Sequence, residues 1–103
     1  MKVNIYKIKK GKENLLKEWG ISIRADLGES LASLIEENCL AESMKIFSID
    51  GETYAVGVMC AEKGKEILPY NPEREINKKH FKVLREVIEE QVKLEDVYTL
   101  AID

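Results

Sequence analysis

Two runs of β-branched, aromatic and other apolar residues flank Asp50-Gly51 in the middle of the chain. Asp-Gly between such runs is typical of a two-residue hairpin, because a type I′ turn requires positive φ at both central residues. The pattern predicts a hairpin over residues 44–61, within strands at 40–49 and 52–62.

Before the hairpin, residues 2–9 alternate apolar and polar side chains, which predicts a strand. A helix is predicted over residues 12–38, because apolar residues recur there at a spacing of four. They are Leu15, Trp19, Ile23, Leu27, Leu31 and Ile35. Gly20 and Gly28 weaken this helix and allow a bend or a break, and Asn38 is a suitable left-handed stop.

After the hairpin, Gly64, Pro69 and Pro72 indicate an irregular connection over residues 63–75, with one helical turn near Ile67. A second helix is predicted from Ile76 or Asn77 to residue 92. The last strand is predicted over residues 96–102.

The predicted fold is α+β, with the order β-α-β-β-α-β of the ferredoxin-like arrangement, in a single domain over residues 1–103. Right-handed crossovers then give a four-stranded antiparallel sheet in the order four-one-three-two, with two helices on one face. The third and fourth predicted strands are apolar on both faces. We therefore expect a second copy of the sheet to cover the other face, giving a homodimer.

Composition narrows the expected partners. The chain has 103 residues, 45% of them hydrophobic, and a formal net charge of −3 without a basic stripe, which argues against nucleic acid. No apolar run approaches the roughly 18 residues of a membrane span. Cys39 and Cys60 are too few and too far apart for a metal site, and are interpreted as free buried thiols of a cytoplasmic protein.

Several short motifs resemble a small bacterial family of unknown function. They are Glu42-Ser43, Ile49-Asp50-Gly51-Glu52-x-Tyr54, Lys10-Gly11-Lys12, Glu18-Trp19 and His80-Phe81-Lys82. That family is similar to the dimeric α/β-barrel group of ferredoxin-like proteins, which includes antibiotic-biosynthesis monooxygenases and haem-degrading enzymes. The resemblance implies a dimeric α/β barrel and carries no assigned functional residue.

His80 is the only histidine, and its helical phase places it on the apolar row of Ile76, Leu84 and Ile88. One interpretation is a hydrogen-bonded core histidine. The other is a ligand-binding or proton-transfer group in a pocket between this helix and the sheet.

The resemblance to haem-degrading enzymes rests on two positions. Those enzymes place an Asn on the first strand and a haem-ligating His on the second helix, where this chain has Asn4 and His80. They also use a Trp just before that helix, and the only Trp here is Trp19 on the first predicted helix. Because of this departure, no haem or other cofactor is predicted.

Four other side chains are candidates for lining a ligand site. Trp19 lies in the apolar row of its helix, Tyr54 lies on a strand and Tyr70 lies in the irregular connection. Packing is the favoured interpretation of Trp19 and Tyr54, whereas Tyr70 could line the mouth of a pocket. Glu42 is either a buried carboxylate or a solvated charge at the start of a strand.

Three hypotheses for function follow. The first is a homodimer that binds a small molecule between sheet and helices, and the second is an oxygenase-like enzyme of the monooxygenase or haem-degrading type. The third is a structural or regulatory dimer without a ligand. No nucleophile motif, phosphate loop or metal-ligand cluster stands out in the chain.

Overall fold

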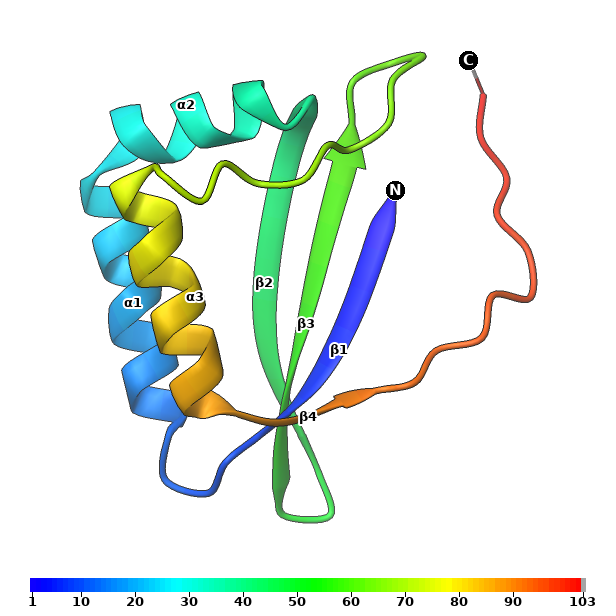
Figure 1. The fold of residues 1–103 in the computed structure, drawn as a ribbon. Helices are drawn as coiled ribbons and strands as arrows, with labels where there is room; N and C mark the ends of the chain where they lie inside the picture. Colours follow the sequence, from blue (N-terminus) through cyan, green and yellow to red (C-terminus); the bar gives the residue numbers. More distant parts are fainter. Residues whose placement is uncertain (103) are drawn as a thin grey trace.

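The predicted hairpin is the most extensively paired element of the structure, a computed structural model that describes residues 1–102 (Figure 1). Its strands, β2 (Cys39–Ile49) and β3 (Glu52–Ala61), run antiparallel up to the pair Ile49↔Glu52. Asp50 and Gly51 have φ values of 51° and 78°. Two positive φ values define a type I′ turn, which confirms the prediction from Asp-Gly.

The sheet has four antiparallel strands. β1 (Lys2–Ile8) pairs with β3 on one side and with β4 (Ile88–Val92) on the other. The order across the sheet is β2-β3-β1-β4, which is the predicted order four-one-three-two counted from the opposite edge. β2 and β4 are therefore the two edges.

Three helices lie on one face of this sheet (Figure 1): α1 (Glu13–Ala25), α2 (Leu27–Glu36) and α3 (Glu75–Val87). The helix predicted over residues 12–38 is divided into α1 and α2, at a break close to Gly28, where the sequence allowed one. The backbone leaves the helical region at Asp26, with φ −112° and ψ 56°. The Ser30 hydroxyl lies 2.9 Å from the carbonyl oxygens of both Ile23 and Asp26, which stabilises the break. α2 consequently turns across the end of the helical layer.

The fourth strand lies earlier in the chain than the predicted residues 96–102. α3 ends at Val87 and β4 follows at once, so the last five residues of the helix predicted over residues 76–92 form a strand instead. The glutamates and glutamine of β4 favour helix by intrinsic propensity. Pairing with β1, which includes Ile8↔Ile88, overrides that local preference.

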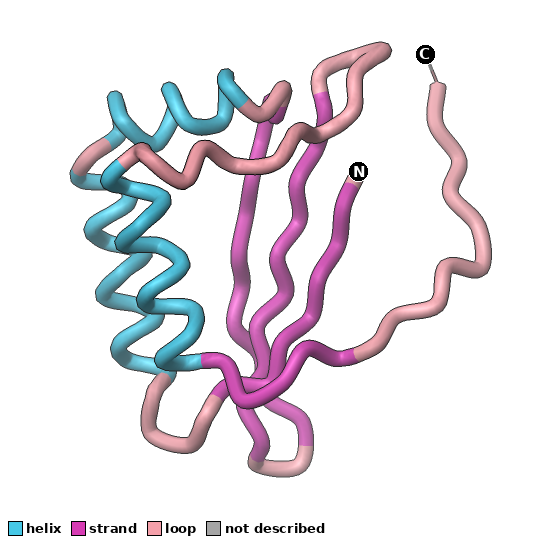
Figure 2. Tube along the Cα trace, in the orientation of Figure 1, coloured by secondary structure: helices cyan, strands magenta, loops and turns pink. Residues whose placement is uncertain are grey.

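Two long stretches contain no helix or strand (Figure 2): residues 62–74 and 93–102. The first is the predicted irregular connection, but it has no helical turn near Ile67. With three helices, a five-residue β4 and an irregular C-terminal segment, this α+β chain departs from the two-helix ferredoxin-like pattern.

The hydrophobic core lies between the helices and the end of the sheet nearest the β1–α1 connection. Its buried members are Ile8, Leu16, Ala55, Leu84 and Val87. They come from the end of β1, the start of α1, β3 and the end of α3. The other end of the same interface is occupied by half-buried aromatic and polar side chains, and it is there that the candidate site lies.

The strand register divides the side chains of the sheet between two faces. Ala55 is fully buried and pairs with Tyr6 and Ile46, so these three point toward the helices. The alternate side chains point to a face that no helix among residues 1–102 covers (Figure 1). We call it the open face; its apolar members include Val3, Ile5, Phe47, Ile49, Tyr54, Val56, Val58 and Val92.

The two cysteines differ in their surroundings. Cys39 is buried as predicted, whereas Cys60 is exposed, which corrects the prediction of two buried thiols. Cys60 belongs to the same alternate set of β3 as Val56 and Val58, so it lies on the open face.

We expect Gly51→Val to lower the free energy of unfolding by about 1–2 kcal/mol or more, because a β-branched residue is disfavoured at the φ of 78° that the turn requires. Gly51→Asn is the matched control and should cost much less, since Asn tolerates this backbone region. Urea unfolding of both variants measures the difference. Equal stability of the wild type and Gly51→Val would contradict the assigned turn.

Candidate functional site

His80 is held on the sheet-facing side of α3. It lies one turn from the buried residues Ile76 and Leu84, and it is half-buried itself. Trp19 of α1 donates its indole N–H to Nδ1 of His80 at 2.8 Å. This hydrogen bond joins α1 to α3. In the sequence, Trp19 and His80 belong to the apolar rows of two different helices.

This hydrogen bond fixes the tautomer of His80. Nδ1 accepts the hydrogen bond from Trp19, so the ring hydrogen of the neutral imidazole must be on Nε2. Burial lowers the pKa of His80, and a bond that needs an unprotonated Nδ1 acts in the same direction. No buried polar side-chain atom among the described residues lacks a partner. Nε2 has no protein partner within residues 1–102 and is not fully buried, so its N–H group is available as a donor.

Aromatic rings continue from His80 along the helical layer. The Phe81 ring meets His80 edge-on at a centroid distance of 5.1 Å. Tyr70, from the connection before α3, stacks on Phe81 at 4.0 Å and stays 41% exposed. Trp19, His80, Phe81 and Tyr70 therefore form one aromatic row, with an imidazole donor in it.

At the end away from the hydrophobic core, the helix-facing side of the sheet carries a different set of side chains. Asn4 pairs with Gly57, and Gly57 pairs with Met44. A Cβ placed on Gly57 would lie 3.6 Å from Cε of Met44, which shows that the methionine covers the glycine. Glu42 pairs with Met59 in the next row. This part of the sheet thus combines flexible thioethers with a carboxylate and an amide.

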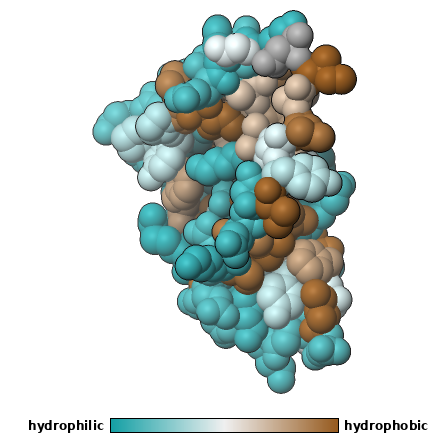
Figure 3. Space-filling model, turned by 90° about the vertical axis from the view of Figure 1, so that its right-hand side faces the viewer, coloured by the Kyte–Doolittle hydropathy of each residue, from teal (hydrophilic) through white to brown (hydrophobic). Residues whose placement is uncertain are grey.

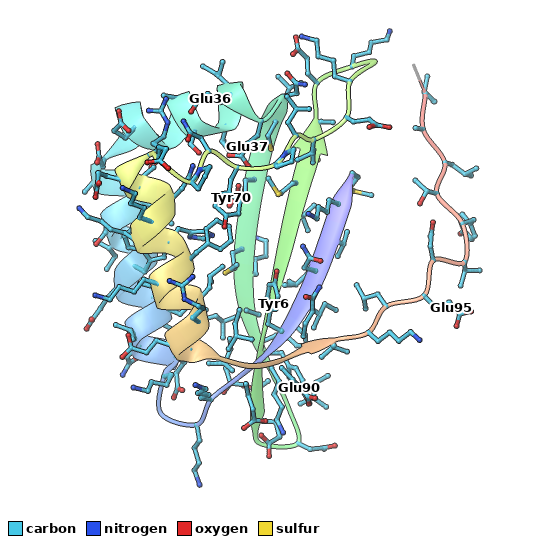
Figure 4. The ribbon with its side chains drawn as sticks, in the orientation of Figure 1. Tyr6, Glu36, Glu37, Tyr70, Glu90 and Glu95 are labelled. Carbon is cyan, nitrogen blue, oxygen red and sulfur yellow. The ribbon has the colours of Figure 1, made fainter. Side chains whose placement is uncertain are left out.

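Two ionisable groups on the sheet influence each other. Burial and then the negative charge of Glu37 raise the pKa of Glu42. Burial and then the negative charge of Glu42 raise the pKa of Tyr6. Glu42 nevertheless keeps more than a third of its surface exposed, so its carboxyl group lies among many protein atoms and can still be reached by solvent. Figure 4 shows Tyr6 on the sheet, and Glu37 and Tyr70 between the sheet and the helices.

A buried chain of polar groups closes one end of this interface. Ser33 Oγ lies 2.9 Å from Oε2 of Glu37 and also 2.9 Å from Oδ1 of Asn77. Nδ2 of Asn77 donates to the carbonyl oxygen of Asn71 at 3.0 Å. Ser33, Glu37 and Asn77 are all buried. The chain ties α2 to the start of α3.

Counting hydrogens assigns the protonation state of Glu37. The bond to the Asn71 carbonyl orients the Asn77 amide, so its Oδ1 must accept from Ser33. A serine hydroxyl has one hydrogen, which leaves Ser33 Oγ as the acceptor toward Glu37. Both contacts are satisfied only if Glu37 carries a proton. Burial raises the pKa of Glu37, in agreement with this assignment.

A groove on the outer side of the helical layer is lined by Trp19, Asp26 and Arg74, among others. Arg74 is already engaged there, with Nη1 2.9 Å from Glu29 and Nε 2.6 Å from Glu36. Its guanidinium therefore does not offer a free charge to an anion, and the groove is a weaker site than the aromatic row.

The structure brings together three of the predicted site residues, His80, Trp19 and Tyr70. Asn4 and Glu42 lie on the helix-facing side of the sheet, where Asn4 accepts a hydrogen bond from Gln91 at 3.0 Å. Tyr54 does not belong to the site. It points to the open face and stacks on Phe47 at 5.5 Å.

Sequence reasoning missed Ser33, Glu37, Asn77 and Phe81. Ser33 and Glu37 are four residues apart, the spacing that brings side chains together on a helix. Their partner Asn77 is far away in sequence, and only the break at Asp26 directs α2 toward it. Phe81 adjoins His80 and was identifiable as an aromatic neighbour.

Residues 1–102 contain neither a metal-binding cluster nor a membrane-spanning helix. No group of three or more His, Cys, Asp or Glu residues in that range is arranged to hold a metal ion. None of its helices is long and apolar enough to cross a membrane.

Comparison with known families gives one match. Residues 1–102 match the model of a family of unknown function, DUF6176, and the chain belongs to this family. No match was found among curated proteins or among solved structures.

We expect Glu37→Gln to stabilise the protein at pH 8 by about 1 kcal/mol, the size of one hydrogen bond, because the amide donates to Ser33 at every pH. Because the pKa of Glu37 is raised in the folded protein, its side chain stabilises the fold fully at pH values below its unfolded pKa of about 4.5. This stabilisation is lost as the pH rises through the folded pKa. The gain over wild type should therefore vanish near pH 4.5. Urea unfolding at both pH values measures it.

Glu36→Gln is the matched control. The hydrogen bond from Arg74 lowers the pKa of Glu36, so this substitution should give no gain at pH 8. Equal destabilisation by Glu37→Gln at both pH values would show that Glu37 is ionised in the folded protein.

Proposed function

We propose that this protein is a homodimer that binds a small molecule between its helices and the helix-facing side of its sheet. The observation that carries the proposal is the bond from Trp19 to His80. It holds a neutral histidine with an outward N–H donor beside two aromatic rings, in the half of the interface that lacks the hydrophobic core.

The chemistry of the site suggests its ligand. The Nε2–H group of His80 suits a carbonyl, carboxylate or phenolate oxygen. The exposed ring of Tyr70 and the side chain of Met44 suit a flat apolar body, and Met adapts readily to irregular shapes. A few polar groups converging on an apolar surface are typical of small-molecule sites.

The tautomer of His80 argues against the haem-degrading alternative. A histidine that ligates a metal normally donates from its other ring nitrogen to an acceptor, and this leaves the ligating nitrogen free of hydrogen. His80 has the reverse arrangement, because Nδ1 accepts from Trp19 and Nε2 holds the hydrogen. Ligation through Nε2 would require the Trp19 bond to break, so these residues do not fit an axial haem ligand.

The open face supports the dimer. A folded monomer of 11.8 kDa is expected to expose roughly 5,900 Å². This chain exposes 7694 Å², an excess of about 1,800 Å² over that expectation. The extended residues 94–102 and the open face share this excess, and a standard interface buries roughly 800 Å² of each partner. Figure 3 views this side of the molecule, where apolar patches lie among hydrophilic ones and where the C-terminal segment also lies (Figure 1).

A second copy fits the open face because its apolar members already form a sheet surface. Two sheets pack face to face through such alternate side chains. Val56 and Val58 on β3 lie between β1 and β2, so the central strand of the face is aliphatic, with Lys45 of β2 beside Val56. Charged groups at its hairpin end, Lys7 with Glu52 and Glu89, pair within the chain.

We expect a screen of small aromatic acids and ketones by thermal shift to find compounds that raise the melting temperature, since ligands stabilise the native state that they bind. His80→Leu should abolish the shift. Trp19→Phe should weaken binding at least tenfold, about 1.4 kcal/mol, because the tautomer is no longer fixed. Isothermal titration of the best compound measures both effects.

Tyr54→Phe, on the open face, is the matched control and should bind as the wild type does. Hemin is included as the test of the alternative, with no Soret shift expected. A stoichiometric Soret shift lost in His80→Ala would favour the oxygenase function. A compound that binds His80→Leu with unchanged affinity would place the site elsewhere.

We expect light scattering at 100 µM to give twice the chain mass of 11.8 kDa. Val56→Lys should give a folded monomer, because a charge at the centre of the open face opposes its burial. Ile35→Lys is the control, since Ile35 is 75% exposed on α2, in the helical layer. A wild-type monomer, or a Val56→Lys dimer of unchanged affinity, would contradict the proposed dimer.

A further inference from the structure

Residues 97–102 combine the sequence of a strand with the exposure of an unpaired segment. Val97, Tyr98, Leu100 and Ile102 are 89%, 75%, 86% and 102% exposed. β-branched and aromatic residues are enriched in strands, and a globular chain buries most of its large apolar side chains. Within residues 1–102, none of the backbone hydrogen bonds outside the helices and strands involves this segment.

The chain's own sheet has no place for this strand. β4 pairs with β1 as far as Ile5↔Val92. If the antiparallel register continued, residues 93–95 would reach the first residues of β1, at Lys2. Residues 97–102 would then extend past the start of β1, with nothing to pair with.

The other edge of the sheet has a long strand with a free side. β2 has eleven residues, contains no proline, and pairs only with β3 among the described strands. Glu42 and Lys45 are its only charged residues. Such an edge presents unpaired N–H and C=O groups to another strand.

We propose that residues 97–102 of each copy add as an antiparallel or parallel strand to the free edge of β2 in a second copy. This deepens the proposed homodimer and rests on it. The C-terminal segment leaves β4 on the side of the open face and runs away from its own sheet (Figure 1). Reciprocal exchange closes the assembly at two copies, and strand addition supplies main-chain hydrogen bonds on which side-chain pockets confer specificity.

The dimensions are compatible with this exchange. The chain has a radius of gyration of 14.4 Å, against about 12.8 Å expected for its length. The five residue steps from Val92 to Val97 span roughly 17 Å when extended. Facing sheets pack about 10 Å apart, so residues 97–102 can reach an edge strand of a second copy that lies opposite β4.

Amide hydrogen exchange of the full chain, measured by mass spectrometry at 1 µM and 100 µM, tests the proposed strand pairing directly. We expect amides of residues 97–102 to be at least 100-fold protected in the dimer and to lose this protection on dilution to the monomer. Exchange at the random-coil rate in the dimer would overturn the proposal. Protection that is equal in monomer and dimer would also overturn it, since it would indicate pairing within one chain.

Leu100→Pro removes a donor from the proposed strand and should weaken dimerisation at least tenfold. Leu100→Val is the matched control, since it keeps the N–H group and the strand preference, and should dimerise as the wild type does. In Leu100→Pro, amides of β2 should also exchange faster than in the wild-type dimer. A Leu100→Pro dimer of wild-type affinity overturns the strand exchange.

The two proposals fail in different ways. A Leu100→Pro dimer that Val56→Lys still dissociates would leave the open-face dimer standing without the strand exchange. A wild-type protein that is monomeric at 100 µM would overturn both.

Discussion

The register of β3 between β1 and β2 is the constraint on which the two faces of this protein depend. Because successive side chains of a strand point to opposite sides, a shift by one residue would exchange the faces completely. The observed register places Ala55 in the core and Gly57 under Met44, while Val56 and Val58 are left on the open face. The type I′ turn at Asp50-Gly51 sets this register through the short connection that it allows.

The break at Asp26 is the second determinant, because it gives the helical layer its third element. A straight helix over residues 12–38 would carry Ser33 and Glu37 away from α3. The break instead brings both residues to Asn77, where Ser33 Oγ lies 2.9 Å from each partner. Burying a carboxyl group is costly unless it is neutral or paired, and a protonated Glu37 satisfies that requirement by completing the polar chain.

Much of the strand framework could be predicted from local signals. Asp50-Gly51 identified the hairpin, the alternation near the N-terminus identified β1, and the handedness of crossovers gave the sheet order. The site was only partly predictable. His80 and Trp19 were both recognised as candidates, but their 2.8 Å bond joins residues that are 61 positions apart. Nothing in the sequence indicated which ring nitrogen would hold the hydrogen.

The errors have a common physical cause in tertiary competition. Ile88–Val92 has a local preference for helix, yet it forms β4 because β1 provides a partner strand. Residues 97–102 have a local preference for strand, yet they remain unpaired because the same chain provides none. Local preference and global structure usually agree in natural proteins. The first disagreement is resolved within the chain by pairing that replaces the lost helical bonds. The second has no such resolution inside one copy, since four large apolar side chains stay exposed and the backbone gains no hydrogen bonds. The proposed strand exchange would resolve it by pairing this segment with the free edge of β2 in a second copy.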